Sequence, residues 1–478
     1  MSCFVSEHTI DMSFFQAVIM AAGQGSRLEE LTTHTPKALL PVANLPLIWY
    51  PINMLQKASY THAIVIVTED HNAAIQKALA DIPQVKISLE FVAIPADSND
   101  WGTAQSLRHI APRIKKPELL VVTCDVISDL PLLLPASLHR RRDATLTVVM
   151  APIQEGLEQT PVAGGKAHRR IEKDYVGLED KADLFDKEKC LVYYQAESEI
   201  EEDSLSVPMS FFKKHPVVNW SNNLLDAHVY FMKRWVLDYL NYKPNISTIK
   251  GELIPRLVQK KERKIDGAEE SIETPSDPEN YNDLKCVQAL LDSLSDQVSK
   301  YSISDKGPVT KSNKLNCFAY VLDENDKFYC TRANNMALYC DANKQVPRHL
   351  MPLEESDEQP QHPGVHPSLP ALHKSTTVGP DSIIGENTTI GERITIKKSM
   401  IGKNCVIKDK VKIVNSVIMD GAVVEEYCNI SGSVIGSRAT ISEKCELKET
   451  IVTGEHVLPK GKKCSNEAVA PEGMMEFI

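Results

Sequence analysis

Residues 17–42 read AVIMAAGQGSRLEELTTHTPKALLPV, and this stretch decides the fold of the N-terminal half of the chain. Its four apolar residues predict a buried strand, and Gly23 and Gly25 then allow positive φ angles and close approach of the backbone. Successive N–H groups in such a turn can bind phosphate oxygens, while Arg27 and Lys37 add positive charge. The stretch therefore predicts a strand that ends in a triphosphate-binding loop.

The pattern distinguishes between two classes of phosphate-binding loop. A dinucleotide-binding loop would need a third glycine at Leu28 and an acidic residue about 20 positions later, and neither is clear. The spacing GxGSRL, LT and PKxLLPVxNxPLI over residues 23–48 instead resembles the nucleotidyltransferases that join a sugar phosphate to a nucleoside triphosphate. Residues 101–104, WGTA, resemble the sugar-site loop of that family, and residues 121–125, VVTCD, resemble the strand that ends in its Mg²⁺-binding aspartate, here Asp125.

Apolar runs alternate with helical patterns between residues 15 and 257. This alternation predicts βαβ units and a Rossmann-like, mostly parallel sheet in an α/β nucleotidyltransferase-like domain at residues 13–258. Residues 156–203 are strongly charged, and we interpret them as an irregular, modified substrate-side lobe. The clearest predicted strands lie at residues 63–67, 89–94, 119–123 and 145–149.

Several residues depart from the pattern of active nucleotidyltransferases. Glu30 replaces a proline, Cys124 replaces the glycine beside the aspartate, and the nearest stretch to a Glu-Lys-Pro sugar motif is RIEKD at residues 170–174. Because catalysis needs every group in place whereas a retained fold does not, we interpret the domain as non-catalytic. Residual binding of GTP, phosphate or Mg²⁺ stays open through five retained residues, Gly23, Gly25, Arg27, Lys37 and Asp125.

The last hundred residues carry a 17-residue repeat. Aliphatic residues recur in steps of six, six and five, beginning at Ile384, Ile390 and Ile396 and continuing to Leu458. Such steps predict coils of three short strands, and hence a parallel β-helix of hexapeptide repeats over residues 378–478. Five coils would rise about 24 Å at about 4.8 Å each. Resemblance to known hexapeptide-repeat proteins implies a left-handed helix.

The cysteines and the histidine of this repeat are expected to be structural residues. Cys405, Cys428 and Cys445 fall at inward positions, where we expect them in the core. His456 is the only histidine after residue 378, and we expect a surface or capping residue there, not the base of an acyltransferase.

One outward row of the repeat is β-branched throughout. Such residues simply suit strands and corners, which is one interpretation. The other is a contact strip for a partner chain, centred on Val406, Val423 and Val457. The full row is Thr389, Val406, Val423, Thr440 and Val457.

Composition excludes several classes of function. A net charge of −11 and a pI near 5.8 argue against nucleic-acid binding and against binding to an anionic membrane. The 11 cysteines include no C-x-x-C pair, which favours a reducing compartment. We find no signal peptide and no apolar run near the ~20 residues that span a bilayer. These features predict a cytosolic protein of the cytoplasm with protein partners.

The region between the two domains sharpens the family resemblance. Residues 259–314 and 353–377 have the composition of linkers. Between them lies a connector at residues 315–352, which reads CFAYVLDENDKFYCTRANNMALYCDANKQVPRHL from Cys317 onward and resembles the connector of the gamma subunits of translation initiation factor 2B. Residues 224–230 and 247–255 agree, so the resemblance covers nearly the whole chain.

That resemblance implies a regulatory subunit of a guanine nucleotide exchange complex that replaces GDP by GTP on translation initiation factor 2. Its partners would be the epsilon subunit first and then the alpha, beta and delta subunits, and we expect no resident cofactor. Epsilon adds a C-terminal exchange domain, whereas this sequence ends just after its last coil, which favours gamma. The alternative is an active guanylyl- or adenylyltransferase acting on a hexose 1-phosphate. In that case Asp125 and Asp226 would hold Mg²⁺ and Lys37 would steady the phosphates.

Overall fold

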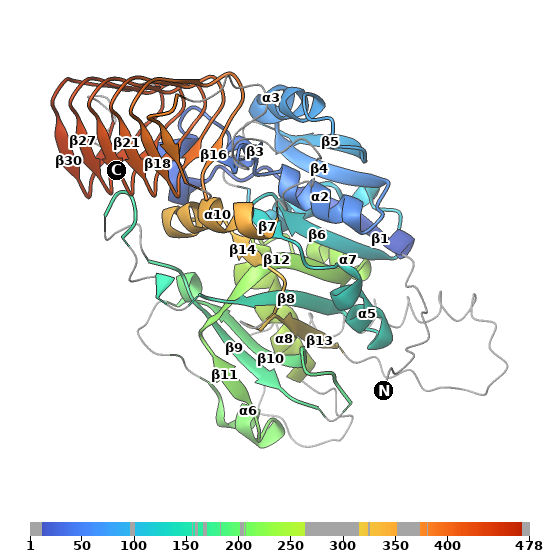
Figure 1. The fold of residues 1–478 in the computed structure, drawn as a ribbon. Helices are drawn as coiled ribbons and strands as arrows, with labels where there is room; N and C mark the ends of the chain where they lie inside the picture. Colours follow the sequence, from blue (N-terminus) through green and yellow to red (C-terminus); the bar gives the residue numbers. More distant parts are fainter. Residues whose placement is uncertain are drawn as a thin grey trace, which may run out of the picture.

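The structure is a computed structural model with two parts, an N-terminal α/β domain and a C-terminal stack of short strands, with helix α10 between them (Figure 1). Among the residues it describes, none of the helices combines the length and apolar character needed to cross a membrane. It describes residues 12–95, 101–154, 156–157, 161–165, 170–181, 183–200, 205, 207–262, 315–323, 326–350, 373–379 and 381–470.

A ten-stranded sheet organises the N-terminal domain in the order β11-β9-β10-β13-β8-β12-β6-β1-β4-β5. Three strands, β10, β11 and β12, run opposite to the other seven, so the predicted mostly parallel sheet is confirmed. The four predicted strands correspond to β4, β5, β6 and β8. The strands are β1 (Phe15–Met20), β4 (His62–Thr68), β5 (Ser88–Ile94), β6 (Glu118–Thr123), β8 (Leu146–Pro152), β9 (Asp174–Glu179), β10 (Glu188–Ala196), β11 (Asn219–Ser221), β12 (Leu224–Lys233) and β13 (Cys317–Val321).

Helices cover both faces of this sheet. The central strand β1 sends Val18 and Met20 into one core and Ala17 and Ile19 into the other, as expected of a strand buried on both faces. The first core receives α4 (Thr103–His109), α7 (Trp235–Tyr242) and α8 (Ile254–Glu262). The second receives α2 (Trp49–Lys57), α3 (Glu69–Ala80), α5 (Leu133–Arg141) and α6 (Met209–Lys214).

The prediction that residues 156–203 are irregular was wrong. Strands β9 and β10 pair antiparallel within this segment, and Leu191 and Val192 are buried in the two cores. The apolar run of β10 is short and is flanked by charged residues, so the sequence did not predict a strand there. Lys189 in β10, for example, pairs with Asp180, with 2.8 Å between Nζ and Oδ1.

The connector belongs structurally to the N-terminal domain. Its strand β13 lies between β8 and β10, and β14 (Cys330–Arg332) pairs with β7 (Val126–Ser128). Its helix α10 (Met336–His349) is capped by Asn335, whose side chain accepts a hydrogen bond from the Leu338 N–H. The predicted linkers fall largely outside the described residues, and α8 continues into the first of them as far as Glu262.

The C-terminal part is a three-sided parallel β-helix in which residue i pairs with residue i+17, as the repeat predicts. Cys405, Cys428 and Cys445 are buried inside it, also as predicted. The first sheet contains β15 (Thr377–Val378), β18 (Thr395–Lys397), β21 (Lys412–Val414), β24 (Asn429–Ser431), β27 (Glu446–Lys448) and β30 (Lys463–Ser465). The second contains β16 (Ile383–Ile384), β19 (Met400–Ile401), β22 (Val417–Ile418), β25 (Val434–Ile435), β28 (Ile451–Val452) and β31 (Ala468–Val469). The third contains β17 (Thr389–Ile390), β20 (Val406–Ile407), β23 (Val423–Val424), β26 (Thr440–Ile441) and β29 (Val457–Leu458).

An apolar row on the second sheet joins the β-helix to the N-terminal domain. These side chains are excluded from the β-helix core and pack with Leu31, Leu47 and the α10 residues Tyr339 and Val346. The Asn44 side-chain amide also donates to the Ile401 carbonyl over 2.9 Å. The two parts are therefore held together by a continuous core. The row is Met400, Val417, Val434 and Ile451.

Candidate functional site

The predicted phosphate loop and the predicted metal aspartate lie side by side. Gly23 and Gly25 follow β1, Asp125 follows β6, and these two strands pair in parallel. Gly25 has a φ of 81°, and a Cβ there would lie 2.9 Å from Cγ2 of Thr32, so only glycine suits the position. A Cβ on Gly23 would meet nothing within 4 Å. The loop thus opens toward solvent at Gly23.

Three of the five residues predicted to bind phosphate or nucleotide line one cavity. Gly23, Lys37 and Asp125 line a cavity of about 140 Å³ at the ends of these strands. Gly25 does not line this cavity. Arg27 is about half exposed and forms an ion pair with Glu172, with 2.6 Å between Nη2 and Oε2. The predicted phosphate-binding arginine therefore points to a carboxylate of the RIEKD stretch.

Asp125 is buried, and both of its carboxylate oxygens are engaged. Lys37 Nζ lies 2.6 Å from Oδ2, and the Thr123 hydroxyl donates to Oδ1 over 2.5 Å. A second cation, the guanidinium of Arg332, lies 3.1 Å from the same Oδ2. Burial raises the pKa of Asp125, but the charges of Arg332 and Lys37 outweigh this effect and hold that pKa well below its usual value.

Arg332 was missed as a site residue by sequence reasoning. It lies in the connector, 207 positions from Asp125. The contact depends on the pairing of β14 with β7, where Arg332 lies opposite Val126. Only this long-range pairing brings the arginine to the site, and no local motif encodes it.

Asp226, the second carboxylate of the enzymatic alternative, is also buried and engaged. The Tyr230 hydroxyl donates to its Oδ2 over 2.6 Å, and the His228 N–H donates to its Oδ1 over 2.7 Å. Burial raises the pKa of Asp226 to about 6, with Lys250 lowering it and Asp174 raising it further. Lys250 itself pairs with Asp174, with 2.8 Å between Nζ and Oδ1.

These residues do not fit a Mg²⁺ ion. Magnesium needs near-octahedral coordination by oxygen ligands that are free to bind it. The oxygens of Asp125 and Asp226 already accept hydrogen bonds, and Arg332 interacts electrostatically with both carboxylates. Across the described part of the chain, His, Cys, Asp and Glu residues do not gather in groups of three that could hold a metal ion.

Residues 247–249 pack directly against the predicted sugar-site loop at residues 101–104. Gly102 lies so near Ser247 that a Cβ would come within 2.2 Å of its carbonyl oxygen. That same oxygen accepts a hydrogen bond from the Ala104 N–H over 2.8 Å, and the Thr103 hydroxyl accepts one from the Ile249 N–H over 2.8 Å. Polar groups of this loop are therefore bound to the neighbouring backbone.

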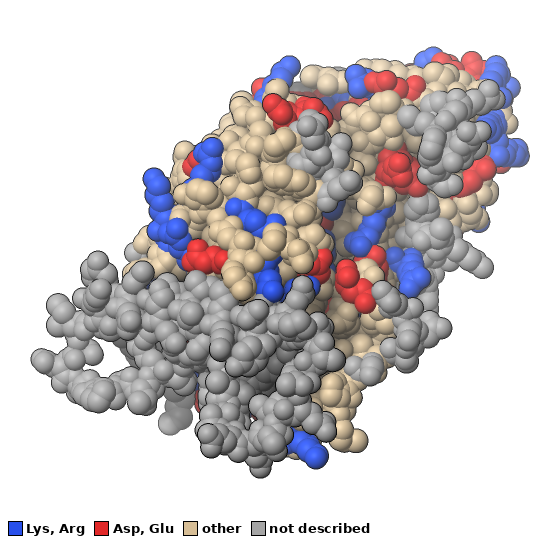
Figure 2. All heavy atoms as spheres, turned by 180° about the vertical axis from the view of Figure 1, so that it is seen from behind, with Lys and Arg blue, Asp and Glu red and all other residues tan. Residues whose placement is uncertain are grey.

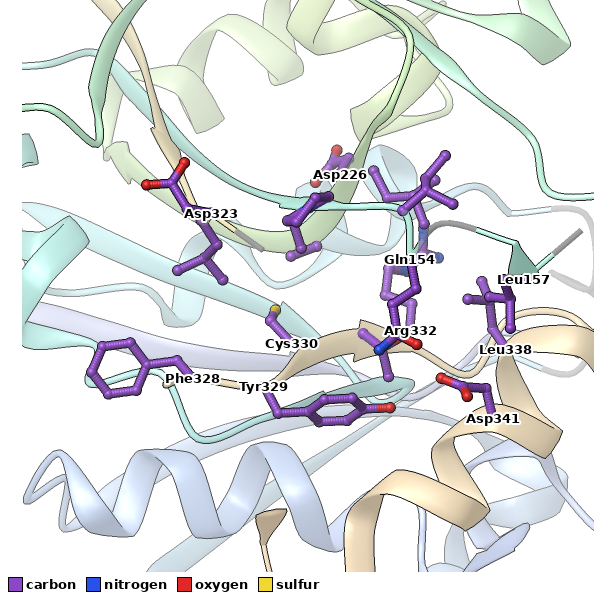
Figure 3. A pocket seen from close by; sticks show the side chains of 17 residues that line it. Gln154, Leu157, Asp226, Asp323, Phe328, Tyr329, Cys330, Arg332, Leu338 and Asp341 are labelled. Atoms are coloured by element: carbon purple, nitrogen blue, oxygen red, sulfur yellow. The ribbon is translucent and has the colours of Figure 1, made fainter. Parts of the chain in front are cut away.

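A second cavity of about 290 Å³ shares a wall with the first. Arg332 lines both cavities, and the second is completed by the ends of β8 and β12 and by connector residues. Figure 3 shows the Tyr329 hydroxyl directed toward the Asp341 carboxyl group across its floor. The connector arginine thus separates two small cavities.

The predicted contact strip forms one row on the third sheet of the β-helix. Val406 and Val423 are partly exposed, and Val457 is 61% exposed. Their register is direct, since Val406 lies opposite Val423 and Thr440 lies opposite Val457. This face is separate from the second-sheet face that packs on the N-terminal domain.

Two protein families match the two parts of the chain. Residues 16–159 match the nucleotidyl transferase family, and residues 368–462 match the EIF2B subunit epsilon LbH domain. The second match gives the β-helix its left-handed sense, as predicted. The fold and site define a nucleotidyltransferase-like protein with a left-handed β-helix.

The relatives specify the family. The chain is 30% identical over 403 residues to translation initiation factor eIF2B subunit gamma of Dictyostelium discoideum, covering 81% of this chain and 87% of that protein. It is 30% identical over 390 residues to the subunit of the same name in Schizosaccharomyces pombe, covering 80% and 73%. The chain belongs to the family of eIF2B gamma subunits, which confirms the resemblance.

Similarity to enzymes is more limited. The mannose-1-phosphate guanylyltransferase of Mycobacterium tuberculosis is 27% identical over 147 residues, which cover 30% of this chain and 38% of the enzyme. Family membership makes the chain a subunit of a multi-subunit initiation factor.

Proposed function

We propose that this chain is a non-catalytic subunit of the initiation factor 2B complex and promotes GDP-to-GTP exchange on translation initiation factor 2 by supporting the epsilon subunit. The observation that carries the non-catalytic role is the state of Asp125. Its carboxylate is held by Lys37 and Arg332, so neither the aspartate nor the lysine is free for a substrate.

The size of the site supports the same conclusion. Ligand pockets usually measure about 300–1,000 Å³. The cavity at Gly23, Lys37 and Asp125 measures about 140 Å³, which is small for a nucleoside triphosphate and a sugar phosphate together. We therefore propose no resident cofactor. Binding of GTP or Mg²⁺ by the retained residues is the outcome that would revise this point.

Epsilon is the proposed direct partner, and the alpha, beta and delta subunits complete the assembly. Charged residues of both signs are interspersed on the face seen in Figure 2, where the described residues form no broad basic surface. This distribution supports protein partners in the cytosol and argues against direct contact with nucleic acid or anionic membrane. The strip at Val406, Val423 and Val457 is the proposed contact for one of these subunits.

Co-purification tests the subunit role. The full chain is expressed with affinity-tagged epsilon, and we expect it to co-purify in a stable complex. An untagged, unrelated nucleotidyltransferase serves as the control. Failure of the chain to co-purify with epsilon, or with the assembled alpha, beta, delta and epsilon subunits, would contradict the proposal.

The enzymatic alternative is tested by pyrophosphate release. The purified chain is given each common nucleoside triphosphate, Mg²⁺ and a hexose 1-phosphate, with Lys37→Ala as the control. We expect no release above that control. Turnover in the range of ordinary enzymes, about 1–10³ s⁻¹, would establish the alternative.

A further inference from the structure

The guanidinium of Arg332 is bound to the buried carboxylate of Asp125 and lines the two cavities that hold Asp125 and Asp226. Its Nη2 is 3.1 Å from Asp125 Oδ2, and the side chain is 10% exposed. Burial lowers the pKa of Arg332, but Asp125, Tyr230 and Asp226 outweigh that effect and raise it above its usual value. The arginine is thus a buried cation that is paired with Asp125 and is also stabilised by the negative charge of Asp226.

The connector fixes this arginine by its backbone as well as by its side chain. Arg332 lies opposite Val126 in the β14–β7 pair, and the Ala333 N–H donates to the Asp125 carbonyl oxygen over 2.9 Å. The main chain and side chain of Asp125 are therefore both bound by consecutive connector residues. The guanidinium is held at the site by the fold.

We propose that Arg332 is a built-in replacement for a divalent cation and keeps metal ions out of this site. Arg332 and Lys37 together bring two positive charges to Asp125, the same charge that one divalent ion would bring. Because both cations are part of the chain, a metal in solution has to displace groups that are already held in place. This inference goes beyond the exchange role and does not depend on it.

The groups left behind without Arg332 could ligate a metal. His228 and Asp125 line the same cavity, and His228 Nε2 is buried without a hydrogen-bond partner among the described residues. Carboxylate and imidazole groups are ligands that Mn²⁺ accepts. Removing the guanidinium together with the Lys37 ammonium, which holds the same Asp125 oxygen, should therefore expose a metal site.

Mn²⁺ binding to the full chain, measured by electron paramagnetic resonance of the free ion, tests the proposal. We expect the native chain and Arg332→Lys to bind no Mn²⁺ at this site. Lys37 would still hold Asp125 Oδ2 in Arg332→Ala, so the double variant Lys37→Ala with Arg332→Ala is used, and it should gain one equivalent that Lys37→Ala alone does not bind. Adding Asp125→Asn to that double variant should abolish the gain, which assigns the site.

Two results would overturn the proposal. One is Mn²⁺ binding by the native chain that disappears in Asp125→Asn, because the arginine would then not exclude metal. The other is a folded protein with both Lys37→Ala and Arg332→Ala that gains no Mn²⁺. Arg332→Gln, which keeps most of the side-chain volume, replaces Arg332→Ala in the double variant if circular dichroism shows that the latter is unfolded. The native measurement decides the first point in either case.

Discussion

Replacing Ile407 by aspartate tests the inner register of the β-helix. Ile407 lies in β20 between Ile390 and Val424 of the neighbouring coils, and its side chain is 1% exposed. The preceding residue, Val406, points outward and is partly exposed. The same aspartate at these two adjacent positions should therefore have opposite outcomes.

The expected loss of folding stability in Ile407→Asp follows from the burial of this position. At pH 7.5 a buried aspartate without a partner has to be protonated, which costs about 5 kcal/mol from an unfolded pKa near 3.9. Loss of the buried isoleucine side chain adds about 2–3 kcal/mol. The sum approaches the whole stability of many domains, about 5–15 kcal/mol. Since the folded pKa is raised, the native state binds more protons, and the penalty at pH 5.5 is smaller by about 3 kcal/mol.

Limited proteolysis with mass spectrometry at both pH values measures the outcome. We expect Ile407→Asp to lose the resistant C-terminal fragment at pH 7.5 and to recover part of it at pH 5.5. Ile407→Asn should be unstable without that pH dependence, and Val406→Asp should remain resistant. A resistant fragment from Ile407→Asp at pH 7.5 would refute the register.

Three further substitutions test other parts of the account. The Val434 side chain is only 1% exposed and lies between the β-helix and the N-terminal domain. Val434→Asp should leave each part resistant to proteolysis but increase the radius of gyration in solution scattering. An unchanged radius would show that this row does not hold the two parts together. Val423→Asp, on the proposed contact strip, should reduce co-purification of partner subunits without lowering the melting temperature. Asn429→Asp, at an exposed position of the first sheet, is the control and should change neither quantity. Equal binding of partner subunits by both variants would show that the strip is not part of the interface. Burial raises the pKa of Asp226 to about 6 from 3.8, so stability should fall by up to about 3 kcal/mol as pH rises from 4 to 6. Denaturant titrations at several pH values should show that the stability of Asp226→Asn depends less on pH over this range. An identical pH dependence in the native chain and the variant would rule out this assignment.

The β-helix was predictable because each coil has the same kind of side chain at the same inward position. Inward aliphatic residues every 17 positions specify both the strands and their register, as with Ile390, Ile407 and Val424. The outward row at Met400, Val417 and Val434 has the same period and is visible in the sequence. Its partner surface is not, because that surface combines α10 with the region around Leu31.

The site was predictable only where its residues belong to local motifs. Gly23, Lys37 and Asp125 each follow a strand or lie in the adjacent loop, and parallel pairing of β1 and β6 brings them together. The role of Arg332 could not be predicted, because the strand pair that places it joins residues about two hundred positions apart. Arg27 follows the expected motif but pairs with Glu172.

Fluorescent GDP release from translation initiation factor 2 tests the central claim most directly. Release is measured with this chain alone, with epsilon alone and with both at saturating concentration. The account predicts that the chain alone has no effect and that it raises the rate given by epsilon, because a partner that stabilises the docking-competent arrangement shifts that equilibrium. Exchange by this chain alone, or an epsilon rate that does not change when the chain is added, would contradict the account.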